Sequence, residues 1–495
     1  MNCKHLLKSR FLAFALVCTP LVPQASAEMI SLNDALYEAL ESNLTLRINA
    51  YQALLREQEV ESARAIFDPT LVGSINTSHQ EQDWTQSESD RSSVSLGLSK
   101  RLQSGTSLSL QSNYLMNDGS RFDSSLNQEI GGNLSHNSGI TLSIRQPLLQ
   151  GFGRAVNMAN IWKAEASLAV AQLDYKNNLL DTINQTEKAY WQVAFQDAQV
   201  ELSKSSVTLA KNLVEETEQR VELGLATRLD LLQARANLAS QQESLIDSQR
   251  ALKDAEDALL LVMGRLDSNY EDVPVEVADL ADPSREFPSL DQVWAGALAQ
   301  DLDLLIQQTQ IESLGFDKVL AKDRNRSELD VVVSGSTAGY DSERGSKSFW
   351  GAFEPQGHDW GVGLELNVPI GKRASKAQLR QIDATIEREY LRLDQLEQSL
   401  FLDVRQAWRS YQVSLEKLDA ARLTLELQQE AFDQEQAKYS EGLAVFRDVQ
   451  QAQQDLDRAR ISELNAWFAA LRALSDLSRL DGSILERHRI NLNFN

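Results

Sequence analysis

Apolar residues recur every seven positions over a long stretch in the first half of the chain. The repeating positions are all valine: Val193, Val200, Val207, Val214 and Val221. A strict seven-residue apolar period is typical of α-helices that pack along a coiled-coil seam. The pattern predicts a helix over residues 155–223, roughly 100 Å long at about 1.5 Å per residue. A helix of this length needs partner helices to bury its stripe.

A second seven-residue series lies in the other half of the chain. Its members are Val404, Tyr411, Leu418, Leu425, Phe432 and Tyr439, in step with the first series under a shift of 218 positions from Val193 onward. The same shift maps Gly224 onto Gly442, and a shift of 258 maps Ser31 onto Ser289. Self-similarity over most of a chain indicates a tandem duplication, so we expect one structural unit built twice.

The duplication divides the chain into two repeats with the same order of elements. The divisions are a signal segment 1–27, the first repeat 28–264, a linker 265–287, the second repeat 288–482 and a C-terminal tail 483–495. The first repeat should hold a helix from about residue 31 to 66, strands within 70–147, the long helix 155–223 and a returning helix 227–263. The second should hold a helix from about 290 to 322, strands within 329–369, a long helix 375–439 and a returning helix 446–481. In each repeat, the two shorter helices together match the long helix in length.

In the strand regions, apolar residues alternate with small polar ones. The first repeat has four candidate strands, around Leu71–Ile75, Val94–Leu98, Leu108–Leu110 and Ile140–Ile144. A strand with one face in lipid and the other in water alternates in this way, and so does the edge of an ordinary β-sandwich. The strands alone leave both interpretations open.

The first 27 residues have the features of a secretory signal. Three basic residues precede an apolar segment, and Ala25-Ser26-Ala27 fits a cleavage site. Both cysteines, Cys3 and Cys18, would be removed with this segment, so the mature chain would use neither disulfides nor thiol chemistry. No later apolar run approaches the ~20 residues of a membrane-spanning helix.

The chain is acidic, with 71 Asp and Glu against 48 Lys and Arg and a formal net charge of −23. This balance argues against nucleic acid as a partner, because nucleic acid is bound by basic surfaces. It fits either a solvated exterior or an electronegative cavity that concentrates cations.

No group of residues in the sequence points to catalysis. The chain has no HExxH motif, nucleophile elbow or phosphate-binding loop, and its histidines after residue 27 are scattered: His79, His136, His358 and His488. His358-Asp359, in an expected external loop, could touch a metal ion, but a solvated histidine is the simpler interpretation. We therefore expect no enzyme activity, no cofactor and no metal site.

The chain resembles the TolC-type outer-membrane efflux channels over essentially its whole mature length. The most specific marks are the two short turns that end the long helices. They are Leu223-Gly224-Leu225-Ala226, followed by Asp230 and Ala234, and Glu441-Gly442-Leu443-Ala444, followed by Asp448 and Ala452. The segments RQPLLQGFGR (145–154) and Val368-Pro369-Ile370-Gly371 are similar to the family's junctions between strand and helix.

The resemblance implies a mainly α-helical homotrimer with a β region. A trimeric α-helical barrel of long coiled-coil helices would cross the periplasm and continue into a shared outer-membrane β-barrel surrounded by lipid. The gated periplasmic tip would meet a periplasmic adaptor protein coupled to an inner-membrane transporter. The implied function is the exit duct of a tripartite efflux or type I secretion system, whose cargo the transporter selects. The alternative is a soluble periplasmic coiled-coil adaptor or structural spacer.

The resemblance also implies two sets of site residues. The periplasmic gate would include Asp230, Tyr439 and Asp448, and the adaptor docking loops would include Leu223, Gly224, Leu225, Gly442 and Leu443. An alternative role for Asp230 is a capping pair with Thr227, whereas Val445 gives Asp448 no such partner. The glycines could equally serve only the tight turns.

The sequence departs from the family pattern in two places. Gln451 replaces a second aperture acid and Ala444 replaces the gating arginine of some members, so we expect a closing network with fewer charges. The first strand region, 70–147, is longer than its counterpart 329–369. It holds either a long external loop or an extra hairpin that would enlarge the barrel.

Overall fold

The computed structural model describes residues 28–82, 87–123, 128–130, 134–266, 275–277, 282–283, 288–354 and 357–490. The expected signal segment, most of the linker and the end of the C-terminal tail lie outside these residues. The chain divides into two compact units. We name them the helical unit (residues 1–42, 185–285 and 414–472) and the sheet unit (residues 43–184, 286–413 and 473–495).

The long and returning helices are continuous, as the periodicity predicts. They are α3 (Arg154–Glu222), α4 (Arg228–Met263), α8 (Arg373–Ser440) and α9 (Phe446–Leu480). The members of the two seven-residue series nearest the middle of the helices are fully buried, among them Val193, Tyr411 and Leu418. In the described part of the chain, no helix combines the length and the apolar character needed to cross a membrane.

The first helix of each repeat, which the sequence predicted as continuous, is broken in two. The first repeat has α1 (Leu32–Ser42) and α2 (Leu44–Arg64), and the second has α5 (Leu290–Gln300) and α6 (Leu302–Arg324). At the breaks, Asn43 and Asp301 have ψ angles of 122° and 121°, and their side chains accept hydrogen bonds from N–H groups of the next turn. Asn and Asp often end one helix and cap the next in this way.

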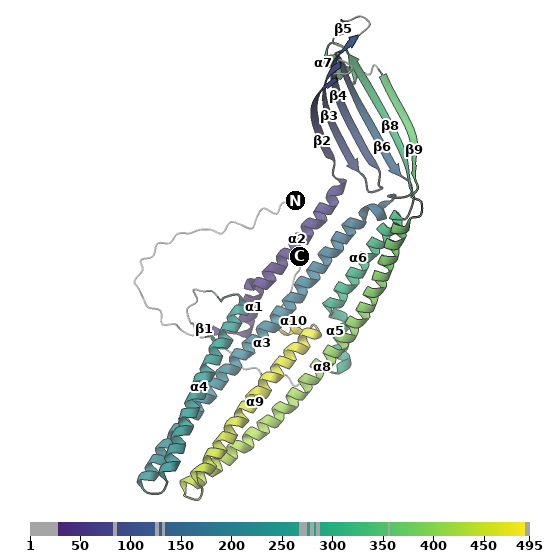
Figure 1. Ribbon diagram of the computed structural model, residues 1–495. Helices are drawn as coiled ribbons and strands as arrows, with labels where there is room; N and C mark the ends of the chain where they lie inside the picture. The colour runs from purple at the N-terminus through teal and green to yellow at the C-terminus, as the bar shows by residue number, and fades with distance from the viewer. Residues whose placement is uncertain are drawn as a thin grey trace, which may run out of the picture. The chain divides into compact units, whose positions relative to one another are not determined.

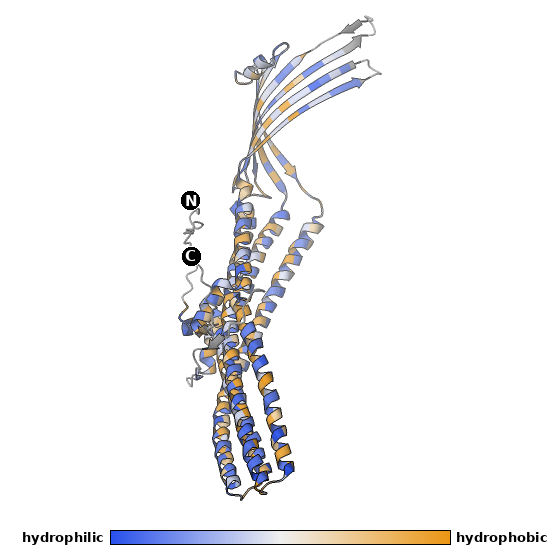
Figure 2. Ribbon diagram, turned by 90° about the vertical axis from the view of Figure 1, so that its left-hand side faces the viewer, coloured by the Kyte–Doolittle hydropathy of each residue, from blue (hydrophilic) through white to orange (hydrophobic). Residues whose placement is uncertain are grey.

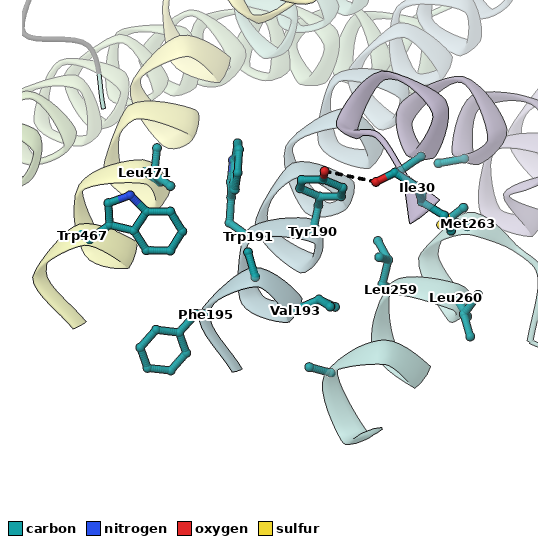
Figure 3. Close-up of a cluster of buried hydrophobic side chains, with 14 of the residues drawn as sticks. Ile30, Tyr190, Trp191, Val193, Phe195, Leu259, Leu260, Met263, Trp467 and Leu471 are labelled. Atoms are coloured by element: carbon teal, nitrogen blue, oxygen red, sulfur yellow. Dashed lines mark hydrogen bonds between the residues drawn. The ribbon is translucent and has the colours of Figure 1, made fainter. Parts of the chain in front are cut away.

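Aromatic side chains form the core of the helical unit (Figure 3). Trp191 of α3 packs edge to face on Trp467 of α9, with ring centroids 6.2 Å apart. The Tyr190 hydroxyl donates a hydrogen bond to the Ile30 carbonyl oxygen at 3.2 Å. This bond fixes the short strand β1 (Glu28–Ile30), which pairs in parallel with β7 (Val275–Val277). Backbone pairing thus joins the start of the first repeat to the linker strand, and the Tyr190 hydroxyl ties it to α3.

The sheet unit contains six long antiparallel strands, which lie side by side in Figure 1. In spatial order they are β2 (Thr70–Gln82), β3 (Ser87–Arg101), β4 (Ser107–Asp123), β6 (Ser135–Pro147), β8 (Glu328–Asp341) and β9 (Gly357–Asn367). The first repeat contributes four of them, as the alternation predicted, so its extra length forms a hairpin. Within the described residues, β2 and β9 are the edges of this sheet.

Four further short elements lie in the described part of the chain, and the sequence predicted none of them as a separate element. They are η1 (Ala65–Phe67), β5 (Gln128–Ile130), which pairs with β4, helix α7 (Gly345–Gly351) between β8 and β9, and α10 (Ile484–Arg487) in the C-terminal tail. Each is too short for its hydrophobic period to be read from the sequence.

The two faces of the sheet differ in polarity. One row of directly paired residues crosses all six strands: Leu71, Leu98, Leu110, Leu142, Gly335 and Trp360. Its five apolar side chains are between 44% and 80% exposed. The opposite face carries mainly Ser, Thr, Asn and Gly, together with Arg145, which pairs with Asp330 at 2.8 Å and Glu365 at 2.6 Å. The alternation is visible along the strands in Figure 2. One face thus suits an apolar environment and the other suits water.

Candidate functional site at the helix turns

Two turns of the helical unit join the long helices to the returning helices, at residues 223–227 and 441–445. In each, the glycine N–H donates to the carbonyl three residues back and the next leucine N–H donates five residues back, over 2.7–3.1 Å. Gly224 and Gly442 have φ angles of 73° and 80°, and a Cβ at either position would meet no atom within 4 Å. Glycine is therefore required by the left-handed backbone of each turn and not by crowding.

The predicted docking leucines lie on the outside of these turns. Leu223, Leu225 and Leu443 are 74%, 72% and 75% exposed. The turns are neighbours, because the last turn of α3 contacts the end of α8. Exposed apolar side chains that gather at one end of a molecule are typical of a protein contact site. The structure thus brings the predicted docking residues together on one surface.

Asp230 forms the capping pair that the sequence left as an alternative. Its carboxylate accepts hydrogen bonds from the Thr227 N–H at 2.8 Å and from the Thr227 hydroxyl at 2.7 Å, and its own N–H donates to that hydroxyl at 3.2 Å. This reciprocal arrangement satisfies two free N–H groups at the start of α4. The Asp230 side chain is therefore already engaged within its own helix.

Asp448, at the matching position of the second repeat, has no such partner. It is exposed, and within the described part of the chain its carboxylate takes part in no hydrogen bond or ion pair. Gln451, one turn later, donates to the Asp455 carboxylate at 3.1 Å. Ala444 packs against the buried cluster around Tyr439. Of the two predicted gate aspartates, only Asp448 is free to act on another group.

Tyr439 is the centre of the contacts between the two turns. The Arg220 guanidinium lies 4.0 Å from the centroid of its ring, a distance suited to a cation–π interaction. Arg220 also donates to the Tyr439 and Ser440 carbonyl oxygens, the latter at 3.1 Å, and so caps the end of α8. Glu216, one turn back in α3, lies 3.3 Å from the Arg220 Nε. Arg220 of the first repeat therefore fixes the last turn of helix α8 in the second repeat.

The ring of Tyr439 is buried in a cluster of apolar side chains from α3, α4, α8 and α9. Phe432 of α8, Phe446 and Val449 of α9 and Leu213 of α3 belong to the same cluster. The Tyr439 hydroxyl is buried without a hydrogen-bond partner within the described residues. Burial of an unpaired hydroxyl costs about 1–3 kcal/mol. Burial of the Tyr439 ring therefore stabilises this cluster, and burial of its unpaired hydroxyl destabilises it.

A second unpaired polar side chain lies on α9 near this cluster. Gln453 is 1% exposed, and in the described part of the chain neither polar atom of its amide has a partner. It borders a cavity of about 50 Å³ that Asn212, Glu216 and Gln436 also line. A buried amide without partners weakens the packing around it. The packing at the start of α9 is thus less stable than it would be with an apolar side chain in place of Gln453.

Sequence reasoning missed Arg220. A sequence signal was available, because the shift of 218 pairs Arg220 with Lys438 and both are basic residues in the last turn of a long helix. Basic side chains there interact favourably with the helix dipole. The signal does not show which of the two reaches across to the other repeat. In the structure Lys438 pairs with Glu435 of its own helix.

One cluster among the described residues has the spacing of a metal site. His79, Glu88 and Asp90 place possible ligand atoms within 4.8 Å of one another, and all three are exposed. His79 Nδ1 already hydrogen-bonds the Asp90 carboxylate at 2.8 Å, an ordinary cross-strand pair. His358 lies in strand β9 and not in the expected loop, and adjacent strand residues point to opposite faces, so His358 and Asp359 cannot share an ion. We assign no metal to either place.

Comparisons with known proteins agree with the duplicated architecture. The profile of a family described as outer membrane efflux protein matches residues 35–265 and 296–483, one segment in each repeat. Outer membrane efflux protein BepC of Brucella suis is 24% identical over 337 residues, which cover 66% of this chain and 68% of that protein. Alkaline protease secretion protein AprF of Pseudomonas aeruginosa is 23% identical over 346 residues, covering 66% and 67%. The Campylobacter jejuni CmeC outer membrane channel has the same fold, with a TM-score of 0.67 and 12% identity over 98% of both chains.

Proposed function

The chain belongs to the outer membrane efflux protein family, and from this we propose that it is the exit duct of a tripartite efflux or type I secretion system. It conducts cargo passively across the periplasm and the outer membrane. Family membership removes the alternative of a soluble periplasmic adaptor or spacer. Members of the family are channel proteins, which also accords with the lack of any catalytic constellation in the sequence.

The observation that carries the proposal is a sheet with one apolar face and one polar face, whose edge strands β2 and β9 have no further partner among the residues that the structure describes. Unpaired edge groups are too costly in lipid, so β2 of one copy pairs with β9 of the next. Three copies with six strands each would close a barrel of eighteen strands. The apolar face would meet lipid, and the face with Arg145, Asp330 and Glu365 would line the water-filled interior.

The two turns of the helical unit supply the gate and the docking surface. Tyr439, clamped by Arg220, holds the helix ends together, and Asp448 is the acid that faces the aperture. Leu223, Leu225 and Leu443 bind the periplasmic adaptor, which is coupled to the inner-membrane transporter that drives export. Gly224 and Gly442 shape the turns and act through the leucines.

Efflux of small molecules and secretion of protein are both supported as cargo classes. One relative is called an efflux protein and the other an alkaline protease secretion protein, at nearly equal identity. The duct carries what its transporter delivers, so the choice depends on the partner and not on this chain.

The test is purification of the tagged chain from outer-membrane detergent extracts after mild crosslinking. We expect a trimer that copurifies with one adaptor and one transporter, and ion conductance when the trimer is placed in a planar bilayer. A monomer recovered from the periplasmic extract, without conductance, would contradict the proposal. The copurified transporter identifies the cargo class.

A further inference from the structure

Three exposed aromatic side chains gather at helix α7 of the sheet unit. Phe349, Trp350 and Phe353 are 40%, 66% and 56% exposed, and their ring centroids are 5.5–5.8 Å apart. Aromatic residues normally bury most of their area. A cluster of three that points away from its own chain indicates a contact with another apolar surface.

The opposite side of α7 is fixed to the sheet. Ser348 and Ala352 are 0% and 3% exposed. The Ser348 hydroxyl donates to the Gly339 carbonyl oxygen at 3.0 Å, and the Thr337 hydroxyl donates to the Ala352 carbonyl oxygen at 2.8 Å. A Cβ on Gly339 would lie 2.1 Å from the Ser348 carbonyl oxygen. Only glycine at 339 permits this docking, so the aromatic side chains are held in one orientation.

The docking places the aromatic cluster on the apolar face of the sheet. Thr337 and Gly339 alternate on β8 with the residues of the polar face, so they share a face with Val333 and Gly335 of the apolar rows. On this face the apolar band runs from Leu329 of β8 to the pair that Gly335 makes with Trp360 of β9, about 20 Å along the strand. Outward apolar bands of transmembrane strands are about 25 Å tall and bordered by aromatic side chains. Helix α7 lies at the end of the sheet that is remote from α6, as Figure 1 shows.

A neighbouring copy of the chain would not cover this cluster. Helix α7 packs on β6 and β8, which are interior strands, whereas copies would join at β2 and β9. The surface that continues from the apolar band on the same face is lipid.

We propose that α7 is an interfacial anchor, whose Phe349, Trp350 and Phe353 insert at the headgroup boundary of the outer leaflet. This inference rests on the proposed placement of the sheet in the outer membrane. The rings are amphipathic or apolar and rigid, which suits that boundary. The anchor fixes the depth of the sheet at its outer end.

The test measures the depth of Trp350 in proteoliposomes of the full trimer. Phosphatidylcholine vesicles carry a nitroxide either near the headgroup or deep in the acyl chain, and the fluorescence of Trp350 is the difference between wild type and Trp350→Phe. Trp360→Phe gives the same difference for a residue within the band. We expect the Trp350 signal to be quenched at least twofold more by the shallow label, and the Trp360 signal more by the deep one.

The outcomes separate the two proposals. If Trp360 is quenched and Trp350 is not, the anchor is wrong and the membrane placement stands. If neither is quenched, both are wrong. Gly339→Val should displace α7 and at least halve the quenching of Trp350. Gly335→Val, on the same face, should leave it unchanged, because a Cβ there would make only an ordinary contact of 3.9 Å with the Asp359 carbonyl oxygen. Equal quenching in the two variants would contradict the docked orientation.

Discussion

The two turns at the tip share a backbone and differ in the side chains around it. Both end a long helix with a left-handed glycine and the same pair of hydrogen bonds. Only the first is followed by a capping box, formed by Thr227 and Asp230. Only the first sends an arginine, Arg220, across to the other repeat. The two repeats have therefore kept the same turn shape and differ in role. Arg220 of the first repeat clamps the end of α8, which belongs to the second repeat.

The largest effect is expected where the turns are alike. Leu225→Ser together with Leu443→Ser removes one exposed leucine from each turn and should reduce export to background while trimer assembly is unchanged. Each single change should cost export to a similar degree, because the two side chains are almost equally exposed. Export assays in a deletion strain measure this. Leu261→Ser, 63% exposed at the other end of α4, is the control. Normal export by the double variant would remove the docking role.

The second prediction tests whether Arg220 of the first turn holds the helix end of the second turn. Arg220→Ala removes the cation–π contact and two hydrogen bonds to carbonyl oxygens, together worth about 1.5–3 kcal/mol. We expect the contact to release at least tenfold more often in each copy, since 1.4 kcal/mol is a factor of ten. The open probability in planar bilayers should therefore rise at least tenfold, and by the cube of the single-copy factor if all three copies must release. Arg220→Lys should restore little, because an ammonium cannot stack and bridge as a guanidinium does. Lys438→Ala, which removes only a pair within its own helix, should leave the conductance as it is; an equal rise in both would refute the asymmetry.

A smaller effect should follow from exchanging the helix starts. Thr227→Ala should lower the free energy of unfolding by about 1 kcal/mol through loss of the cap. Val445→Thr places a threonine three residues before Asp448 and should create the missing cap, with a gain of about 0.5–1 kcal/mol. Thermal unfolding of the trimer in detergent reports both. In an Asp448→Ala background, Val445→Thr should no longer raise the free energy of unfolding. A rise that persists in that background would have a cause other than the cap.

The smallest effect concerns the returning helices, where α9 carries Asp457 and α4 has Ala239 at the matching position. Burial raises the pKa of Asp457 above its ordinary value, although Ser206 donates a hydrogen bond to it at 2.9 Å. An acid with a raised pKa stabilises the fold below its ordinary pKa, and this contribution is lost as the pH rises through the raised value. Asp457→Asn should therefore raise the unfolding temperature at pH 7 and leave it nearly unchanged below pH 4. A rise of the same size at both pH values would show that ionisation is not the cause.

Much of the fold follows from period and repetition. The seven-residue series of valines places α3, and the second series, from Val404 to Tyr439, places α8. The alternation of apolar with small polar residues places β2, β3, β4 and β6. The breaks at Asn43 and Asp301 did not follow, because a capping side chain acts on the backbone without disturbing the apolar stripe. Helix α7 did not follow either, since seven residues are two turns and give no measurable period.

The candidate site was predicted only in part. The turn residues could be named because glycine and flanking leucines leave a local signature. The role of Arg220 depends on where a long side chain ends in space, across 219 positions of sequence, and no local pattern encodes that distance. The cap at Asp230 was one of two interpretations from the sequence, and geometry decided between them.

The clamp lies wholly within one chain, and this has a statistical consequence for an assembly of three. Each copy would carry its own clamp between Arg220 and Tyr439. These clamps, or latches, would release independently unless the helices couple them. If passage needs all three released, the conducting fraction varies as the cube of the release constant of one. A tenfold weakening of each latch would then raise leakage about a thousandfold, which makes a single kind of weak contact a steep control on permeability.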